Sequence, residues 1–254
     1  MPTMENYDIK MFFNQLRDTI SNTKGLYVFP LGFAREHPIL CIRPKPTIDG
    51  PRVLISGGFH GDEVSGPWGI VEYLKNNDYP TDVNLSILPL VNPTGFVLSR
   101  RRDFWGDEPN RGYMGGAKPV EKASYEDDIL NKNLGILSIL AKDCYMSFHE
   151  DDEENFYFYT YSGDNGKIEE KLRELGSETF GLMPEEKTRV IAGSGANYTR
   201  GSVIDEYDNS FEHAMKTKGV KKVITVEVPG LRDFNQRVNF IREVLEEICK
   251  PEYY

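Results

Sequence analysis

Two residues whose side chains can bind a metal, His60 and Glu63, follow an apolar run at residues 53–55. The run predicts a buried strand, and Gly57 and Gly58 predict a sharp turn at its end. A histidine and a glutamate three residues apart can point at the same ion. The spacing alone is also typical of a capped helix start. If a third ligand exists elsewhere in the chain, these two residues form half of a catalytic metal site.

Two further residues of this kind occupy similar places. His149 stands at the end of the apolar run that begins at residue 144, and Glu227 interrupts the apolar run 223–228. A glutamate inside an apolar strand is costly unless it is paired or belongs to a site. Open α/β sheets place their sites at the carboxyl ends of strands. Two histidines and one glutamate leave one zinc position open for water, and this mixed donor set favours zinc over magnesium or calcium.

The surrounding pattern predicts the elements that position these residues. Apolar runs and helical faces alternate along the chain, and the strand, helix and strand around Glu63 imply parallel pairing with a right-handed crossover. We expect a single α/β domain over residues 1–254, with a twisted, mixed, mostly parallel sheet covered by helices on both faces. The predicted strands are 26–33, 39–42, 53–55, 83–91, 144–150, 156–161 and 223–228, and the predicted helices include 7–20, 125–142, 167–180, 208–218 and 231–248.

Composition excludes several classes of protein. The net charge of −10 argues against a general nucleic-acid or anionic-membrane binder. Three scattered cysteines are too few for a disulfide framework. No apolar run approaches the roughly 18 residues of a membrane span, and the first residues lack the apolar segment of a signal peptide. We therefore expect a cytoplasmic protein, with its oligomeric state left open.

Residues 96–122 show no periodicity, and long loops of this kind are usually functional or disordered. The loop contains Arg100, Arg101, Arg102 and then Asn110-Arg111. One interpretation is a solvated basic run, and the other is a loop whose guanidinium groups bind carboxylate oxygens. Another charged stretch lies near residue 213. The neighbours Glu212 and Lys216 indicate that His213 is exposed rather than a ligand.

Taken in chain order, these motifs resemble the zinc carboxypeptidase family, including its succinylglutamate desuccinylase/aspartoacylase branch. The resemblance spans roughly residues 53–229. It rests on His60-x-x-Glu63, Asn-Pro-Thr-Gly at 92–95, Arg101, Asn110-Arg111, His149 and Thr-Val-Glu-Val-Pro at 225–229.

The resemblance implies a role for each matching residue. His60, Glu63 and His149 would hold one zinc ion, and Glu227 would be the base that activates water and protonates the leaving amine. Arg101 would stabilise the oxyanion, although a slip of one residue to Arg100 or Arg102 is open. For the substrate, Asn110 and Arg111 would bind the terminal carboxylate, Tyr198 would close over it, and Ile204 and Asp205 would line the specificity pocket.

The implied activity is hydrolysis of an amide bond next to a free carboxylate, as in a carboxypeptidase acting on a small peptide. The alternatives are an N-acyl-amino-acid amidohydrolase of the aspartoacylase type and a zinc-binding relative without catalysis. The chain departs from the family at Glu108-Pro109, where relatives usually carry Asp-Leu, and at Ser147, where an aspartate is common. The acidic residues 150–154 are either a solvated loop or a subsite for a basic group.

Overall fold

The computed structural model describes residues 3–45, 49–76, 79–113, 122–161, 166–192, 197–204 and 208–254. In this part of the chain, nine strands form one sheet in the order β1-β2-β4-β3-β5-β9-β6-β8-β7. The strands are β1 (Leu26–Ala34), β2 (His37–Pro44), β3 (Arg52–Gly57), β4 (Asn84–Leu88), β5 (Cys144–Asp151), β6 (Tyr157–Thr160), β7 (Asn197–Thr199), β8 (Ser202–Ile204) and β9 (Lys222–Pro229).

The centre of the sheet is parallel. β3 pairs in parallel with β4 and with β5, and β5 pairs in parallel with β9. The flanks are mixed, because β1 and β2 pair antiparallel at one edge, while β6 runs antiparallel to β9 and β7 antiparallel to β8 at the other. The predicted α/β class is therefore confirmed, with parallel pairing confined largely to the middle.

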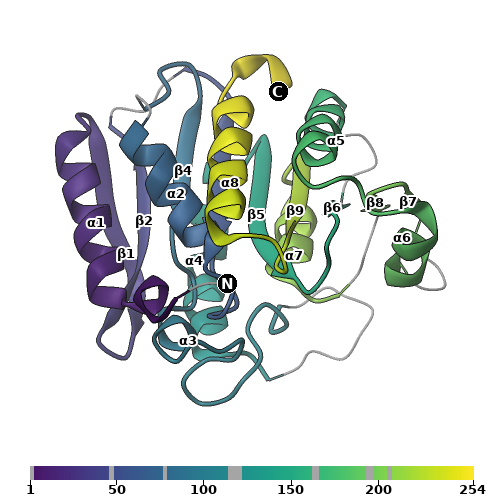
Figure 1. Cartoon of the computed structure of the whole chain (residues 1–254). Helices are drawn as coiled ribbons and strands as arrows, with labels where there is room; N and C mark the ends of the chain where they lie inside the picture. The colour runs from purple at the N-terminus through teal and green to yellow at the C-terminus, as the bar shows by residue number, and fades with distance from the viewer. Residues whose placement is uncertain are drawn as a thin grey trace.

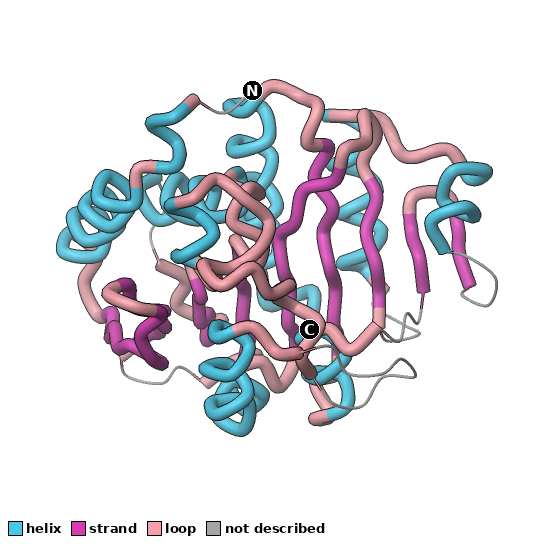
Figure 2. The backbone as a smooth tube through the Cα atoms, turned by 90° about the horizontal axis from the view of Figure 1, so that it is seen from below, coloured by secondary structure: helices cyan, strands magenta, loops and turns pink. Residues whose placement is uncertain are grey.

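Helices cover both faces of the sheet, as expected (Figure 1 and Figure 2). One face carries α1, α2, α5 and α8, with α8 packed beside α2 (Figure 1), and the other carries α4 and α7. The described helices are α1 (Ile9–Asn22), α2 (Ser65–Asn76), α3 (Pro93–Val97), α4 (Tyr125–Leu140), α5 (Lys167–Thr179), α6 (Glu185–Ala192), α7 (Phe211–Thr217) and α8 (Phe234–Ile248), with short 3-10 turns at η1 (Met4–Tyr7) and η2 (Pro251–Tyr253).

The apolar strand β3 explains why two layers of helices form. Val53 and Ile55 are buried in the core on the α2 and α8 face, whereas Leu54 is buried in the core on the α4 and α7 face. A strand buried on both faces reads as a continuous apolar run rather than an alternating one. Burial of such side chains contributes about 1.5–3 kcal/mol each relative to exposure.

Side-chain caps fix where several helices begin. Asp8 accepts from the backbone of α1, and Ser124 and Asp127 form a capping box at α4. Asn92 accepts from the Gly95 backbone at 2.7 Å and begins α3. The Asn-Pro-Thr-Gly motif therefore begins a short helix.

No described helix combines the length and the apolar composition that crossing a membrane would require.

Candidate metal centre and active-site cavity

Glu63 lies between the two histidines. Its Oε1 is 2.5 Å from His60 Nδ1, and its Oε2 is 3.0 Å from His149 Nδ1. All three side chains are buried. One ligand atom from each residue can be chosen so that all lie within 4.8 Å of one another. The structure therefore brings the three predicted ligands together.

The turn after β3 depends on two glycines. Gly58 has a φ of +69°, a left-handed conformation that side chains disfavour. A Cβ on Gly61 would lie 2.0 Å from the Gly95 backbone carbon, so the turn after His60 packs directly on α3. The second histidine, His149, comes from the neighbouring strand β5. β5 pairs with β3 up to Gly57 and Phe148, and His149 follows directly.

The charges at this centre favour a cation. Burial would raise the pKa of Glu63, yet the two imidazoles outweigh it and hold the pKa well below its ordinary value. Burial alone would lower the pKa of His149, but the carboxylates of Glu63 and Glu212 raise it to about 10. The pKa of His60 stays below its ordinary value because burial dominates there. Positive charge is therefore stabilised at His149, beside the Glu63 and Glu212 carboxylates, although burial disfavours it at His60.

The side chains fit a divalent metal ion. The Nδ1 atoms of both histidines face the Glu63 carboxylate, whereas both Nε2 atoms point away and are buried without a hydrogen-bond partner. Each Nε2 faces a carboxylate: Glu108 Oε1 is 3.8 Å from His60 Nε2, and Glu212 Oε1 is 3.6 Å from His149 Nε2. Metal-ligating histidines typically present their second nitrogen to a carboxylate in this way. Ligation through Nδ1, together with Glu63, is the arrangement that the geometry allows.

Glu227 lies beside the centre on β9. It is the register partner of His149 and lines the same cavity as the three ligand-type residues. Burial, reinforced by the carboxylates of Glu63 and Asp151, raises its pKa to about 8 even though His149 and Arg101 oppose the shift. A carboxylate with a raised pKa can take up and release a proton near neutral pH.

The three consecutive arginines are in different environments. Arg101 lines the cavity, with Nη1 3.3 Å from Glu63 Oε1 and Nε 2.5 Å from Glu108 Oε1. Arg100 donates to the Asp103 carbonyl, and Arg102 donates to the Gly106 carbonyl. Neither is among the described residues that line the cavity. Of the three, Arg101 therefore has the position that an oxyanion-binding residue needs.

Glu108, at the point of departure from the family pattern, supports this arrangement. Its carboxylate binds Arg101 and lies 3.4 Å from Arg102 Nη2, besides facing His60. The carbonyl of Arg101 accepts from the Asn92 side chain and the Gly61 backbone. The loop is thus fixed to both the metal centre and α3, despite the different residues at 108–109.

Asn110 and Arg111 also line the cavity. The Asn110 backbone has a φ of +62°, and its amide is engaged on both sides: Oδ1 accepts from the Phe211 backbone at 2.7 Å, and Nδ2 donates to Glu212 at 3.0 Å. Arg111 Nη1 donates to the Asn110 carbonyl and lies 3.6 Å from Asp208. These contacts hold the Arg111 guanidinium at the cavity wall.

The remaining predicted substrate residues are Tyr198, Ile204 and Asp205. Tyr198 is in β7, where it pairs with Val203 of β8 at the outer edge of the sheet, and it is absent from the described residues that line the cavity. Asp205 falls outside the described residues, so its predicted role as a specificity residue stays a prediction. Ile204 ends β8.

Several residues that line the cavity were not predicted from the sequence. Glu212 and His213 are both buried, so the prediction of an exposed His213 is wrong. The cause is that α7 packs against β5 and β9. Three alternate tyrosines, Tyr157 and Tyr159 of β6 and Tyr161 just after it, form another wall. Their period of two was a signal that could have placed them on one face.

The acidic run after His149 is not a plain solvated loop, because Glu150 and Asp151 line the cavity. Glu150 pairs with the buried Arg237 of α8 and accepts from the Ser65 backbone at 2.6 Å. Asp151 accepts from the Tyr157 hydroxyl at 2.5 Å, and Glu153 pairs with Lys187. These contacts hold β5 to its surroundings, and a subsite for a basic group at this run stays a prediction.

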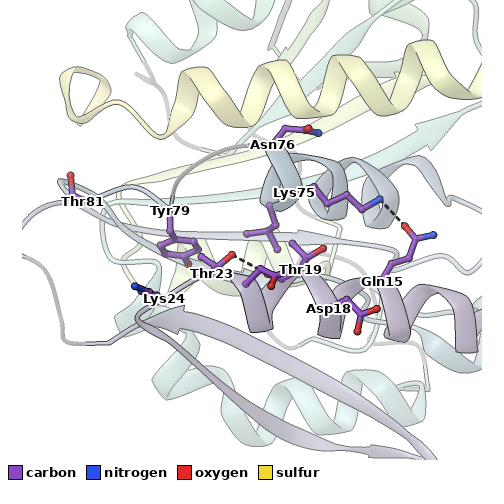
Figure 3. Close-up of a pocket in the computed structure, with 11 residues that line it drawn as sticks. Gln15, Asp18, Thr19, Thr23, Lys24, Lys75, Asn76, Tyr79 and Thr81 are labelled. Atoms are coloured by element: carbon purple, nitrogen blue, oxygen red, sulfur yellow. Dashed lines mark hydrogen bonds between the residues drawn. The ribbon is translucent and has the colours of Figure 1, made fainter.

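The cavity at the metal centre has a volume of about 190 Å³ and is lined mostly by polar and charged side chains. A larger hollow of about 1170 Å³ lies at the ends of α1 and α2 (Figure 3). There Lys75 donates to Gln15 at 2.7 Å, and Asp18 is the one carboxylate among the described residues that line it, with no histidine. The groups suited to catalysis are therefore gathered in the smaller cavity.

Known proteins share this fold, and a family model matches part of the chain. Residues 49–151 match the succinylglutamate desuccinylase/aspartoacylase catalytic domain. No curated protein sequence matches the chain. A candidate metallopeptidase from Shewanella denitrificans is 30% identical with a TM-score of 0.85, and the match covers 97% of this chain and 92% of that one. Another from Shewanella amazonensis is 29% identical with a TM-score of 0.84, over 97% and 95% of the two chains.

A more distant match shows the fold alone. The metallo-carboxypeptidase from Burkholderia cenocepacia is 17% identical with a TM-score of 0.65, over 95% of this chain and 68% of that one. These matches identify a metallopeptidase-like protein with a carboxypeptidase-like fold, and the His–Glu–His cluster is its candidate metal site. The chain belongs to the zinc carboxypeptidase family, which includes the succinylglutamate desuccinylase/aspartoacylase branch.

Proposed function

We propose that this protein is a zinc-dependent hydrolase that cleaves an amide bond next to a free carboxylate, in the manner of a carboxypeptidase. One observation carries the proposal: His60, Glu63 and His149 converge in a cavity that Glu227 and Arg101 also line. Two nitrogen donors and one oxygen donor suit zinc, and three protein ligands leave a position open for chemistry.

Each residue has a defined part in the reaction. A bound zinc ion would polarise the scissile carbonyl and acidify an attacking water. Glu227 takes the proton of that water and later delivers it to the leaving amine. Arg101 donates to the oxygen on which negative charge develops. Arg111 fixes the free carboxylate of the substrate, since its guanidinium can bind both carboxylate oxygens.

The size of the cavity favours a small substrate. Its volume of about 190 Å³ lies below the roughly 300 Å³ at which pockets for drug-sized ligands begin. A single C-terminal residue or a small N-acyl amino acid suits such a volume. The match of residues 49–151 supports the second candidate function, an N-acyl-amino-acid amidohydrolase. A metal-binding role without catalysis is less well supported, because binding alone does not need Glu227.

A substrate panel tests the reaction class. We would measure hydrolysis of C-terminal dipeptides and of N-acyl amino acids, each with its carboxylate free and with that carboxylate converted to an amide. We expect turnover of free acids in one of the two series and little turnover of the amides, because Arg111 binds the carboxylate. Equal hydrolysis of the acids and the amides would refute recognition of a free carboxylate.

The role of Arg111 has its own test. Arg111→Ala should mainly raise KM, because the guanidinium binds a part of the substrate that does not react. Steady-state kinetics on the best free-acid substrate would show this. An unchanged KM would remove Arg111 from substrate binding.

A further inference from the structure

Glu212 is a buried carboxylate in contact with two parts of the site. It lies in the first turn of α7 and is 1% exposed. Its Oε2 accepts from Asn110 Nδ2 at 3.0 Å, and its Oε1 faces His149 Nε2 at 3.6 Å. Glu212 therefore joins the candidate metal ligand to the loop that carries Arg101 and Arg111.

The two facing atoms of Glu212 and His149 are complementary. His149 Nε2 and Glu212 Oε1 are both buried, and neither has another hydrogen-bond partner. An imidazole that offers the lone pair of Nδ1 to a metal carries its proton on Nε2. That proton needs an acceptor, and Glu212 Oε1 is the carboxylate oxygen positioned to accept it. A closure of a few tenths of an ångström would make this a normal hydrogen bond.

The position of Glu212 is fixed by its own helix. The Ser210 hydroxyl accepts from the His213 backbone at 3.1 Å and caps α7, while Asp208 accepts from the Ser210 backbone at 3.1 Å. Asn110 Oδ1 accepts from the Phe211 backbone at 2.7 Å. Burial of an unpaired charge would be strongly unfavourable. A carboxylate held at this position is therefore paired with the donors that face it, and it can fix their orientation.

We propose that Glu212 is a positioning residue that orients His149 toward the metal and links the metal centre to the loop of Asn110 and Arg111. This inference rests on the proposed function, because it assumes that His149 is a ligand. The pairing also explains why a buried glutamate occupies this helix: its two oxygens receive donors from two separate elements.

A glutamine at this position cannot do the same work. The His149 and Asn110 groups that face Glu212 are both donors, so the residue between them must accept twice. An amide has one acceptor oxygen and one donor nitrogen, and whichever way it is turned, one contact becomes donor against donor. Glu212→Gln keeps the shape of the side chain and removes one of its two hydrogen bonds.

The experiment measures zinc affinity by competition with a chelator, and it measures kcat and KM on the same proteins. We expect Glu212→Gln to bind zinc about 10- to 100-fold more weakly, the usual effect of losing a partner of a metal-ligating histidine. The paired change Asn110→Asp with Glu212→Gln exchanges donor and acceptor, so the glutamine amide again has a partner and its oxygen can accept from His149. This double variant should recover most of the lost zinc affinity.

A matched control is Glu126→Gln, which removes another buried carboxylate. Glu126 is not one of the described residues that line the cavity. The zinc affinity of this variant should equal that of the wild type. Thermal unfolding of the metal-free proteins separates the proposal from a merely structural role. Lower stability of Glu212→Gln with unchanged zinc affinity would overturn the inference.

The outcomes also separate the inference from the proposed function. If Glu212→Gln binds zinc as tightly as the wild type, and the wild type hydrolyses its substrate, the role of Glu212 is refuted and the proposed hydrolase function is not. A wild type that binds no zinc would refute both. If Glu212→Gln does not fold, the double variant decides: normal zinc affinity supports the pairing, and weak affinity in a folded double variant refutes it.

Discussion

At the scale of residues, the arrangement around Arg101 separates it from its neighbours. Its guanidinium contacts Glu63 and Glu108 and lines the cavity, whereas Arg102 is 56% exposed in its side chain and bonds a loop carbonyl. Three like residues in a row carry no signal of their own. The loop backbone, held by Asn92 and Gly61, selects which of them faces the metal centre.

This difference leads to a kinetic prediction. Arg101→Ala should lower kcat about 100- to 1,000-fold, the usual effect of removing a donor to the oxyanion. Arg102→Ala is the matched control, with the same loss of charge on the same loop, and its kcat should stay within a few-fold of the wild type. A larger loss for Arg102→Ala than for Arg101→Ala would reverse the assignment.

Glu126 gives a prediction about pH and stability. It is fully buried, accepts from the Thr94 hydroxyl at 2.5 Å, and leaves Oε2 without a partner. Burial raises its pKa to about 7 despite that hydrogen bond, from an ordinary value of 4.5. The folded protein therefore binds this proton more tightly than the unfolded chain. The stability contributed by the proton is complete below about pH 4.5 and is lost as pH rises through about 7.

Glu126→Gln should remove this dependence on pH. The shift corresponds to roughly 3 kcal/mol at about 1.4 kcal/mol per pKa unit. Relative to the wild type, the free energy of unfolding of the variant should rise by up to about that amount between pH 5 and pH 8. Urea unfolding at both values measures it. A difference between variant and wild type that does not change with pH would contradict a raised pKa at Glu126.

At the scale of elements, Glu150 and Arg237 join β5 to α8. Arg237 is 1% exposed and pairs with Glu150, which also accepts from the Ser65 backbone at the start of α2. One ion pair thus connects the strand that carries His149 with two helices of the same layer. The sequence did not reveal this pair, because 87 residues separate its members.

Breaking this pair should destabilise the fold. Arg237→Met leaves the Glu150 carboxylate buried and unpaired, and the expected cost is about 3–5 kcal/mol in the free energy of unfolding. The double variant Glu150→Gln with Arg237→Met leaves no buried charge and should regain much of that loss. Denaturant unfolding compares the three proteins. A loss below about 1 kcal/mol for Arg237→Met would show that the pair is solvated.

The sequence predicted some elements well because their signals were local. β3, β5 and β9 were recognisable as apolar runs, since buried parallel strands lack alternation. The strands β7 and β8 were missed, because three residues are too short for a periodic pattern. Helix α7 was found but its burial was misjudged, because Glu212 and Lys216 on a short helix resemble a solvated face. The Glu212 carboxylate can be buried because Asn110 and His149, from distant segments, present donor groups to it.

At the scale of the whole molecule, the sheet topology assembles the site. The parallel order β4-β3-β5-β9 places the carboxyl ends of β3, β5 and β9 side by side. Gly57, His149 and Glu227 therefore lie together at these carboxyl ends. The order of the motifs along the chain indicated the ligands and the family. The register that sets Glu227 opposite His149 could not be read from the sequence, because register depends on how distant strands pair.

The most direct test of this account is the zinc content of protein purified without chelators, measured together with turnover of the free-acid panel by the wild type and by Glu227→Gln. We predict one zinc ion per chain in both proteins, with turnover in the wild type and its loss in Glu227→Gln. The variant keeps the three ligands and loses only the base. Protein without zinc, or a Glu227→Gln variant as active as the wild type, would contradict the account.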